Sequence, residues 1–408
     1  MAAAGSMAGG GARPYVTDTI QKYRYTLIHA GWLCVIAALA LSTISVYTID
    51  VGLRPDAAEG GLAPRASSQL VFIAIGIFSG AAAVLPHYRL IGFLAWPAMA
   101  LSVGLLVFLL LPGVPDSIVR PVNGARAWIQ LGFFNLQPSE LTKIAFVLVV
   151  AQYLRFRRTH RTFMGLLPIA GIAFVPLALI LKQPDMGTAL LFIPTLFALL
   201  VAAGARIRHL VIIVLVAALA APAVYPVLKP YQKARIKAVI SQIRGEREGA
   251  HGINYQSLTA QSLAGSGQLT GSSDAHTRAL ARFNPLPERH NDMIFSIVVA
   301  RFGFLGGLGV LALYMLWISG ALLAAAACKD PFGRLLCVGL MAFIGTQVVV
   351  NVGMNVGLLP IIGITLPFLS HGGSSMITVW IMTGLIVNVA IRKPVPPFRE
   401  SFEYGDDE

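Results

Sequence analysis

Long apolar blocks, separated by short polar connections, dominate this chain. Most are about 18 residues or longer and carry few charges, which is the length that a helix needs to cross a bilayer. The pattern predicts an all-α polytopic membrane protein of about ten transmembrane helices, at residues 27–49, 69–86, 89–112, 139–156, 165–182, 187–204, 210–228, 293–327, 335–354 and 373–391. The block 293–327 is long for one span, so we expect it to tilt or to project beyond the bilayer.

Basic residues at the ends of these blocks predict their orientation. With the N-terminus inside, the short inner loops hold many more Lys and Arg residues than the short outer loops. This positive-inside bias predicts that residues 1–26 and 392–408 form cytoplasmic tails, the first of them disordered. The chain is 56% hydrophobic and 12% charged, with a net charge of +13. Because the basic residues follow the membrane topology, we expect no nucleic-acid partner.

One outer loop, about residues 229–291 between the seventh and eighth spans, is long and basic. Long loops cross the membrane largely regardless of charge, so the topology stands. Within this loop, Ile236, Val239, Ile240 and Ile243 follow helical spacing. The spacing predicts an amphipathic helix, which either lies on the outer membrane surface or packs on the bundle. A basic outer surface would suit an anionic lipid headgroup or a pyrophosphate.

An aspartate, Asp292, stands where this loop enters the eighth span. A charge near hydrocarbon costs free energy unless it is solvated, paired or used. Two interpretations follow: Asp292 caps the helix that begins at Met293, or it takes part in chemistry. Its neighbours Glu288 and His290 could tune its pKa or, as a weak alternative, Glu288 and Asp292 could bind a metal ion.

Other polar residues lie at the outer ends of predicted spans. Glu140 and Lys143 are three residues apart and share a helix face, so either an internal ion pair or a substrate contact is possible. Asp185 precedes the sixth span, with Thr188 three residues later, which is typical of a helix N-cap.

Four groups of motifs resemble a known family. They occur in one order along the chain: Asn123–Ile129 with Gln137–Lys143; Gln183–Ala189; Tyr231–Gln232 and Arg235–Ile236 with Gly265–Gly267 and Pro287–Asp292; and Gly357–Pro360 through Ser370–Ser375. Together they resemble the RodA/FtsW/SpoVE, or SEDS, family over about residues 20–395. The resemblance implies a peptidoglycan glycosyltransferase of the bacterial cytoplasmic membrane that polymerises lipid II for elongation, division or sporulation.

The resemblance also implies partners and roles. A class B penicillin-binding protein would be the partner, lipid II and membrane lipid would be bound, and a divalent cation, Mg²⁺ or Mn²⁺, would assist. Asp292 matches the family's essential loop aspartate, which makes it the candidate general base of an inverting displacement. The candidate substrate-binding residues are Arg126, Trp128, Glu140, Lys143, Gln183, Asp185, Glu288, His290, Ser370, His371, Ser374 and Ser375. Among them, Arg126 could bind pyrophosphate, and Trp128 could stack on a sugar or anchor the interface.

The chain departs from the family pattern at Ala300-Arg301, where members typically carry two glutamates. Arg301 would need a new partner or a water-lined cavity. Residues 271–282 also lack the usual glycine-rich run. Two alternatives stay open. One is a lipid II flippase, since ten spans with intramembrane charges also suit transport. The other is a scaffold for the penicillin-binding protein without catalytic activity, which the departure at Ala300-Arg301 favours.

Overall fold

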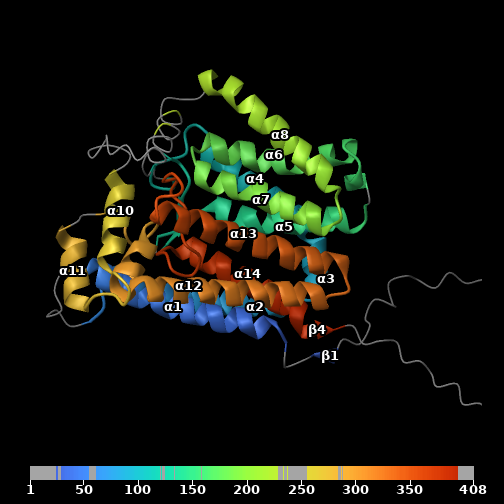
Figure 1. Ribbon diagram of the computed structural model, residues 1–408. Helices are drawn as coiled ribbons and strands as arrows, with labels where there is room; N and C mark the ends of the chain where they lie inside the picture. Colours follow the sequence, from blue (N-terminus) through green and yellow to red (C-terminus); the bar gives the residue numbers. More distant parts are fainter. Residues whose placement is uncertain are drawn as a thin grey trace, which may run out of the picture.

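The computed structural model describes residues 24–25, 29–54, 61–119, 121, 125–132, 134–157, 159–227, 233, 237, 255–283, 286 and 288–393. These residues form a bundle of long helices that run along one common direction (Figure 1). The α-helices are α1 Gly31–Leu53, α2 Pro64–Val84, α3 Tyr88–Phe93, α4 Ala95–Leu110, α5 Pro138–Arg155, α6 Leu167–Lys182, α7 Met186–Ala202, α8 Ile207–Val224, α10 Tyr255–Ser266, α11 Asp274–Phe283, α12 Ile294–Ala327, α13 Pro331–Asn355 and α14 Gly373–Ile391.

Short elements complete the description. Three turns of 3-10 helix lie at η2 Thr159–Arg161, η3 Met164–Leu166 and η4 Tyr225–Val227. Strand β1 (Arg24–Tyr25) pairs antiparallel with β4 (Arg392–Lys393), and β2 (Ile129–Gln130) pairs antiparallel with β3 (Asn135–Leu136). The β1–β4 pair joins the two ends of the described chain at one end of the bundle (Figure 1).

Every predicted apolar block contains a helix. Within the described residues, six helices are long and apolar enough to cross a membrane: Gly31–Leu53, Pro64–Val84, Met164–Lys182, Ile294–Ala327, Pro331–Asn355 and Gly373–Ile391. Three shorter apolar helices lie at Ala95–Leu110, Met186–Ala202 and Ile207–Ala223. The all-α membrane fold is therefore confirmed, and the orientation of the spans stays a prediction.

Two predicted spans are interrupted. The block 89–112 is divided into α3 and α4 at Leu94, because Pro97 has no N–H to continue the hydrogen-bond ladder. The block 293–327 is divided at Gly303, whose backbone has φ +72° and ψ −173° inside α12. Only glycine adopts this conformation without strain. The first nine residues of α12 can thus take their own direction.

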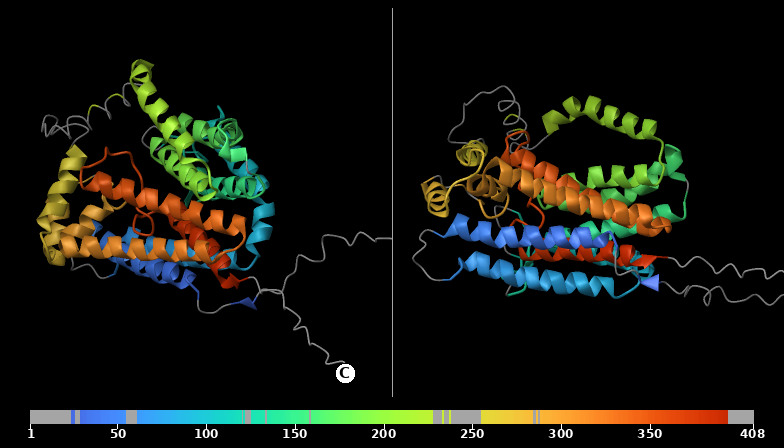
Figure 2. Two further views of the ribbon diagram at one scale, coloured as in Figure 1. Left: turned by 45° about the vertical axis from the view of Figure 1, so that its right-hand side comes forward. Right: turned by 60° about the horizontal axis from the view of Figure 1, so that its bottom comes forward.

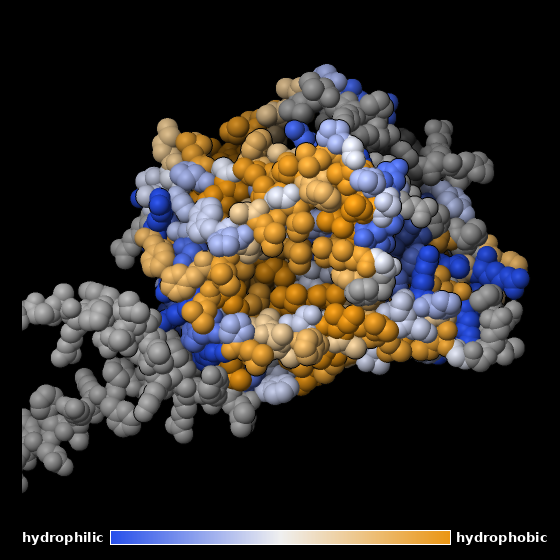
Figure 3. Space-filling model, turned by 180° about the vertical axis from the view of Figure 1, so that it is seen from behind, coloured by the Kyte–Doolittle hydropathy of each residue, from blue (hydrophilic) through white to orange (hydrophobic). Residues whose placement is uncertain are grey.

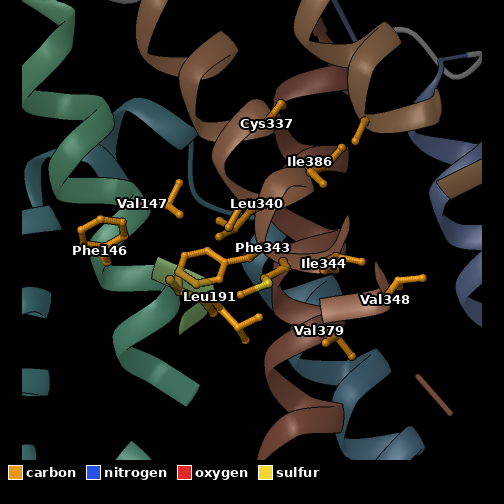
Figure 4. Packing of buried hydrophobic residues seen from close by; sticks show 14 of the residues in the cluster. Phe146, Val147, Leu191, Cys337, Leu340, Phe343, Ile344, Val348, Val379 and Ile386 are labelled. Carbon is orange, nitrogen blue, oxygen red and sulfur yellow. The ribbon is translucent and has the colours of Figure 1, made fainter. Parts of the chain in front are cut away.

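The interior of the bundle is apolar and tightly interlocked. The rings of Phe146, Phe192 and Phe343, from α5, α7 and α13, meet edge to face with centroids 5.0 to 6.2 Å apart. Figure 4 shows Phe146 and Phe343 within this core. Outward side chains are apolar as well, and they form a broad hydrophobic band with hydrophilic residues towards both ends (Figure 3). A protein whose surface as well as its core is apolar is solvated by lipid. Helix α8 lies at the edge of the bundle, with most of its side chains exposed (Figure 2).

Helices α10 and α11 cover one end of the bundle, opposite the β1–β4 pair (Figure 1). We call it the outer end, because the sequence predicts that it faces away from the cytoplasm. Residues 271–282, expected as a loop, contain most of α11. A second apolar core, separate from that of the bundle, joins Ala260, Leu263, Ala281 and Leu286 to the first turns of α12. The amphipathic helix expected at 236–243 lies outside the described residues apart from position 237.

The segment 356–372, between α13 and α14, has no regular helix and folds back into the outer end. Leu366, Phe368 and Leu369 of this segment are buried. Non-helical backbone at membrane depth must be enclosed by protein or line a wet cavity, and residues 366–370 of this segment are enclosed. It supplies one wall of the candidate site.

Candidate functional site

Asp292 lies at the outer end, at the start of α12, and its side chain does not cap the helix. Met293 occupies the N-cap position and makes no side-chain capping bond. Within the described residues, the carboxylate of Asp292 has no hydrogen bond or ion pair. Its backbone carbonyl instead accepts hydrogen bonds from the side-chain amides of Asn351 (2.8 Å) and Asn355 (2.9 Å). The backbone is thus fixed while the carboxylate stays uncommitted.

The two asparagines stand one turn apart on α13 and form a short polar ladder. The Asn351 amide also donates to the carbonyl of Ile364 at 2.6 Å. The Asn355 side-chain oxygen accepts from the backbone N–H and the hydroxyl of Ser296, at 3.2 and 2.7 Å. Asn351, Asn355 and Ser296 are fully buried, where a hydrogen bond is costly to lose. The ladder fixes α13, α12 and the 356–372 segment around Asp292.

The surroundings of Asp292 favour its neutral form. Burial raises the pKa of Asp292 to about 7, and the like charges of Glu288 and Asp185 add to the effect. A carboxyl group with a pKa near neutrality can hold or release a proton at physiological pH, which suits acid–base chemistry. Glu288 itself is exposed and accepts a hydrogen bond of 2.6 Å from the Asn291 side chain.

Gly363 brings the 356–372 segment against the carboxylate. Its φ is +76°, and a Cβ atom there would contact Asp292 Oδ2 at 3.4 Å. On the other side, a Cβ at Gly187 would lie only 2.8 Å from the carbonyl oxygen of Ile362. The start of α7, with Asp185, therefore packs against the same backbone that faces Asp292.

A basic and polar rim lies beside the aspartate. The Arg65 guanidinium, from the first turn of α2, reaches the His290 ring at 2.6 Å. The His371 ring lies 3.1 Å from the Ser68 hydroxyl, and its backbone N–H donates to the His290 carbonyl at 2.9 Å. Burial, helped by neighbouring positive charge, lowers the pKa of both histidines to about 4. At neutral pH the positive charge here therefore comes from Arg65 and the neighbouring Arg289 and not from the histidines.

The serines of the last motif, Ser370, Ser374 and Ser375, make hydrogen bonds to the backbone of neighbouring segments. The Ser370 hydroxyl donates to the Asn291 carbonyl at 2.7 Å, next to Asp292. The Ser374 hydroxyl donates to the Asn135 carbonyl at 2.7 Å and accepts from the N–H of Gln137 at 3.0 Å. Ser375 donates to the Gly372 carbonyl at 3.3 Å. These bonds place the start of α14 against both the Asp292 loop and the start of α5.

Asp185 forms the N-cap of α7, as its spacing to Thr188 predicts. Its Oδ1 accepts from the Thr188 N–H at 3.0 Å, and its Oδ2 accepts from the Gln137 side chain at 3.2 Å. Glu140 and Lys143 form an ion pair of 2.7 Å within α5, and both side chains are almost fully buried. Among the residues that the structure describes, the second carboxylate oxygen of Glu140, Oε2, has no hydrogen-bond partner.

Three predicted site residues engage other parts of the outer end. Gln183 is buried and donates to the Leu106 carbonyl at 2.9 Å, which joins α6 to α4. Arg126 donates to the Val114 carbonyl at 2.8 Å, within the loop that follows α4. Trp128 is half-buried in the same loop. Within the described residues, no hydrogen bond or ion pair joins these three to Asp292.

Three residues of the site were not predicted: Arg65, Asn351 and Asn355. In the sequence, Arg65 is one of the few basic residues of the short outer loops. Such residues were used only to predict the membrane orientation. Asn351 and Asn355 are polar residues four positions apart at the end of an apolar span, and such spacing puts them on one helix face. Intramembrane polar residues at helical spacing were thus the available signal.

Comparison with known proteins gives a consistent result. Residues 29–394 match the sequence model of the FtsW/RodA/SpoVE family, described as cell cycle protein. The chain is 35% identical to stage V sporulation protein E of Bacillus subtilis over 294 residues, covering 72% of this chain and 77% of that protein. It is 31% identical to the probable peptidoglycan glycosyltransferase FtsW of Trichlorobacter lovleyi, covering 90% of this chain and 93% of that protein.

Solved structures agree. A chain of a peptidoglycan synthase complex, in which polymerisation and crosslinking are coordinated, superposes with a TM-score of 0.73 at 30% identity, covering 90% of this chain and 97% of that chain. The rod shape determining protein RodA of Thermus thermophilus superposes with a TM-score of 0.62 at 27% identity, covering 90% and 96%. This multi-pass membrane protein therefore belongs to the FtsW/RodA/SpoVE family, the SEDS proteins.

Proposed function

We propose that this protein is a peptidoglycan glycosyltransferase that polymerises lipid II at the outer face of the bacterial cytoplasmic membrane. The observation that carries the proposal is the state of Asp292. Its backbone is fixed by two buried asparagines, its side chain caps no helix, and its pKa is raised to about 7. A structural aspartate would use its carboxylate in a hydrogen bond or an ion pair, so these features favour a reactive group.

The proposed reaction is one inverting displacement. The 4-hydroxyl oxygen of the acceptor sugar forms a bond to the anomeric carbon of the donor, while the bond from that carbon to the lipid diphosphate breaks. The hydroxyl proton passes to the Asp292 carboxylate, and the departing diphosphate keeps the electron pair. One carboxylate is enough, because a diphosphate leaves without being protonated. Gly363 of the 356–372 segment packs against one side of the base.

Positive charge beside the base would stabilise the departing diphosphate. Arg65 is the charged residue of the rim, and it is held on the His290 ring at 2.6 Å. Guanidinium groups bind phosphate oxygens through two parallel hydrogen bonds, which makes Arg65 the proposed diphosphate ligand. Arg126 could hold the second substrate, but it would have to leave the Val114 carbonyl.

A divalent cation is part of the proposal only through the substrate. Among the described residues, no three His, Cys, Asp or Glu side chains come together in a group that could hold a metal ion. The described residues therefore hold no cluster of three such ligands, and no step of the reaction is routed through a metal ion. Mg²⁺ is usually bound by one or two carboxylates together with substrate phosphates, so a cation brought in on the lipid diphosphate would need few protein ligands and would offset the diphosphate charge.

A class B penicillin-binding protein is the proposed partner. The support is the TM-score of 0.73 with a chain of a peptidoglycan synthase complex, whose partner activity is crosslinking. A glycan strand that leaves the outer end would meet a crosslinking enzyme on the same side of the membrane.

The test is glycan formation from labelled lipid II by the protein co-purified with this partner. Wild type and Asp292→Asn, which keeps the size of the side chain, are compared. We expect polymer from the wild type and a loss of about 10²- to 10⁴-fold in the variant. Equal polymer from both would remove Asp292 from the reaction. Transfer of lipid II across vesicles without polymer would favour a flippase, and partner activation without either activity would favour a scaffold.

A further inference from the structure

Arg301 finds a new partner at the outer end. Its guanidinium donates to Asp274, the first residue of α11, and is also 2.9 Å from the Tyr47 hydroxyl and 3.0 Å from the Ser272 carbonyl. The Tyr47 hydroxyl in turn donates to the Asp274 carboxylate at 2.6 Å. Three elements, α1, α11 and α12, thus meet at one charged cluster. The charge that Arg301 brings is neutralised by an aspartate 27 positions earlier.

A second ion pair repeats this connection. Arg278, one turn further along α11, pairs with Asp50 of α1 at 3.3 Å. Asp50 also accepts from the Ala63 N–H at 2.8 Å, so it ties the start of α2 to the same place. Helix α11 is therefore attached to α1 at two successive turns, and we call the Asp274–Arg301 and Asp50–Arg278 pairs the α11 clamp.

The clamp lies at the interruption of α12. The carbonyl of Arg301 accepts from the Ser272 N–H at 3.2 Å. Beyond Gly303, the N–H groups of Phe304 and Leu305 donate to the carbonyls of Gln268 and Leu269, at 2.8 and 3.1 Å. The connection from α10 to α11 thus takes over hydrogen bonds that a continuous helix would make itself. The first nine residues of α12 are held by this connection as much as by the rest of α12.

These nine residues carry Asp292 at their outer end. Met293 and Ile297 pack with Leu263 of α10 and Ala281 of α11 in the second apolar core. Arg289, three residues before Asp292, donates to the carbonyl of Ala281 near the end of α11. A displacement of α11 relative to α1 would therefore move the segment that bears Asp292.

We propose that Arg301 and Asp274 are positioning residues, which set the place of Asp292 by clamping α11 to α1 and α12. The clamp acts through the α11–Arg289 contact and the second apolar core, and neither residue touches the reacting atoms. This inference rests on the proposed polymerase activity.

Positioning, and not general stability, is the expected effect of the clamp. The side chains of Arg301 and Asp274 are 26% and 41% exposed, and ion pairs of that exposure contribute little to folding. A displacement of about 1 Å at a catalytic group, in contrast, can lower a rate about 100-fold. Loss of the Asp274–Arg301 pair should therefore change kcat much more than the unfolding temperature.

The experiment uses the full chain with its penicillin-binding partner and labelled lipid II. Arg301→Ala and Asp274→Ala are each expected to lower kcat about tenfold, with KM within about twofold of wild type. The double variant should be no worse than either single variant, because both remove the same contact. Arg301→Lys keeps the charge and should recover most of the rate. Arg282→Ala, an exposed arginine on the same helix, is the matched control and should match wild type.

A distance measurement separates this inference from the proposed function. Spin labels at His276→Cys on α11 and Thr43→Cys on α1 report the distance between the two helices. Cys328 is partly exposed and is replaced by Ala so that it is not labelled, whereas Cys34 and Cys337 are fully buried and can stay. We expect one narrow distribution for the wild type and a broad or shifted one for Arg301→Ala and Asp274→Ala. If the wild type made no polymer but the variants still showed broad or shifted distances, the proposed polymerase activity would be overturned and the clamp would not. Unchanged distances, unchanged kcat or additive losses would overturn the clamp.

Discussion

Asn355, near the end of α13, donates a hydrogen bond of 2.9 Å to the backbone carbonyl of Asp292, 63 positions earlier in the chain. The same side chain accepts from Ser296, in the first turn of α12. One amide thus fixes both sides of the junction between the outer loop and α12. Asn355 therefore fixes the backbone of Asp292, the proposed base, through a side chain that is itself fully buried.

Replacing Asn355 by alanine should lower polymerase activity much more than binding. The Asp292 carbonyl would keep only Asn351, and Ser296 would lose its acceptor, so the base is expected to shift. We expect kcat to fall about 10- to 100-fold with KM within a few-fold of wild type. Steady-state kinetics on lipid II, corrected for the folded fraction, measures this.

Asn388→Ala is the matched control for Asn355→Ala. Asn388 is also a buried asparagine whose amide donates to backbone carbonyls, those of Ala83 and Pro86, but it lies at the opposite end of the bundle. Its loss should cost similar stability, about 1–3 kcal/mol, with kcat per folded molecule unchanged. Equal losses of kcat in the two variants would show that Asn355 acts through stability alone.

The pH dependence of the rate should follow Asp292. A general base works in its ionised form, and burial together with the charges of Glu288 and Asp185 raises the pKa of Asp292 to about 7. The rate is therefore expected to rise with pH up to about 7 and then level off. The lowered pKa values of His290 and His371, about 4, keep both rings out of this range.

Glu288→Gln tests the assignment of that pH profile. The change removes a negative charge that raises the pKa of Asp292, so that pKa falls and the base ionises at lower pH. We expect the rising limb to move by roughly half a unit to one unit towards acid. Asp116→Asn, an exposed aspartate of another outer loop, should leave the limb in place. A limb that stays, or moves towards alkaline pH, would argue against Asp292 as the titrating group.

The buried pair of Glu140 and Lys143 should dominate the stability of α5. Lys143→Met leaves the Glu140 carboxylate buried without its partner, and such losses cost about 3–5 kcal/mol. The double variant, Glu140→Gln with Lys143→Met, should recover more than half of that loss because no unpaired charge remains. Thermal unfolding in detergent measures both. Lys329→Met, which changes an exposed lysine, is the control and should leave the unfolding temperature unchanged. If the double variant were as unstable as Lys143→Met alone, the expectation would be contradicted.

The fold was predictable because membrane spans leave a local signal. Length and apolar composition located a helix in each block, and the ends of α14 agree with the predicted 373–391. The breaks were less visible, since Gly303 is one of several glycines in α12 and its role depends on the backbone of Gln268 and Leu269. A helix end that is set by a distant loop cannot be inferred from the helix alone.

The site was predictable where a motif names it, and hidden where it depends on distant contacts. Asp292 and the N-cap role of Asp185 follow from local sequence. Asn355 contacts a residue 63 positions away, and Arg65 meets His290 across 225 positions. Arg301 was expected to need a partner, but Asp274 was not identified, because nothing in the sequence indicates that α11 folds back over α12.

Removal of divalent cations should stop polymerisation without affecting the fold. The described residues hold no cluster of three metal-ligating side chains, so a cation is expected to bind only together with the lipid diphosphate. Chelation should reduce glycan formation to background, and added Mg²⁺ or Mn²⁺ should restore it. The unfolding temperature without substrate should be the same with chelator and with cation. A cation-dependent unfolding temperature would instead indicate a site made by the protein.

Arg65 should be required for the departure of the diphosphate. Its guanidinium is the main positive charge of the rim beside Asp292, and it is held there by the His290 ring. Arg65→Ala is expected to lower kcat/KM about 100-fold, since charge that stabilises a leaving group acts on the transition state. The kcat/KM of Arg65→Lys should lie between those of the wild type and Arg65→Ala, because an ammonium group keeps the charge but cannot make paired hydrogen bonds to phosphate. Lys182→Ala, which removes an exposed charge at the same end of the bundle, is the control and should keep wild-type kinetics. A wild-type kcat/KM in Arg65→Ala would show that other residues stabilise the departing diphosphate.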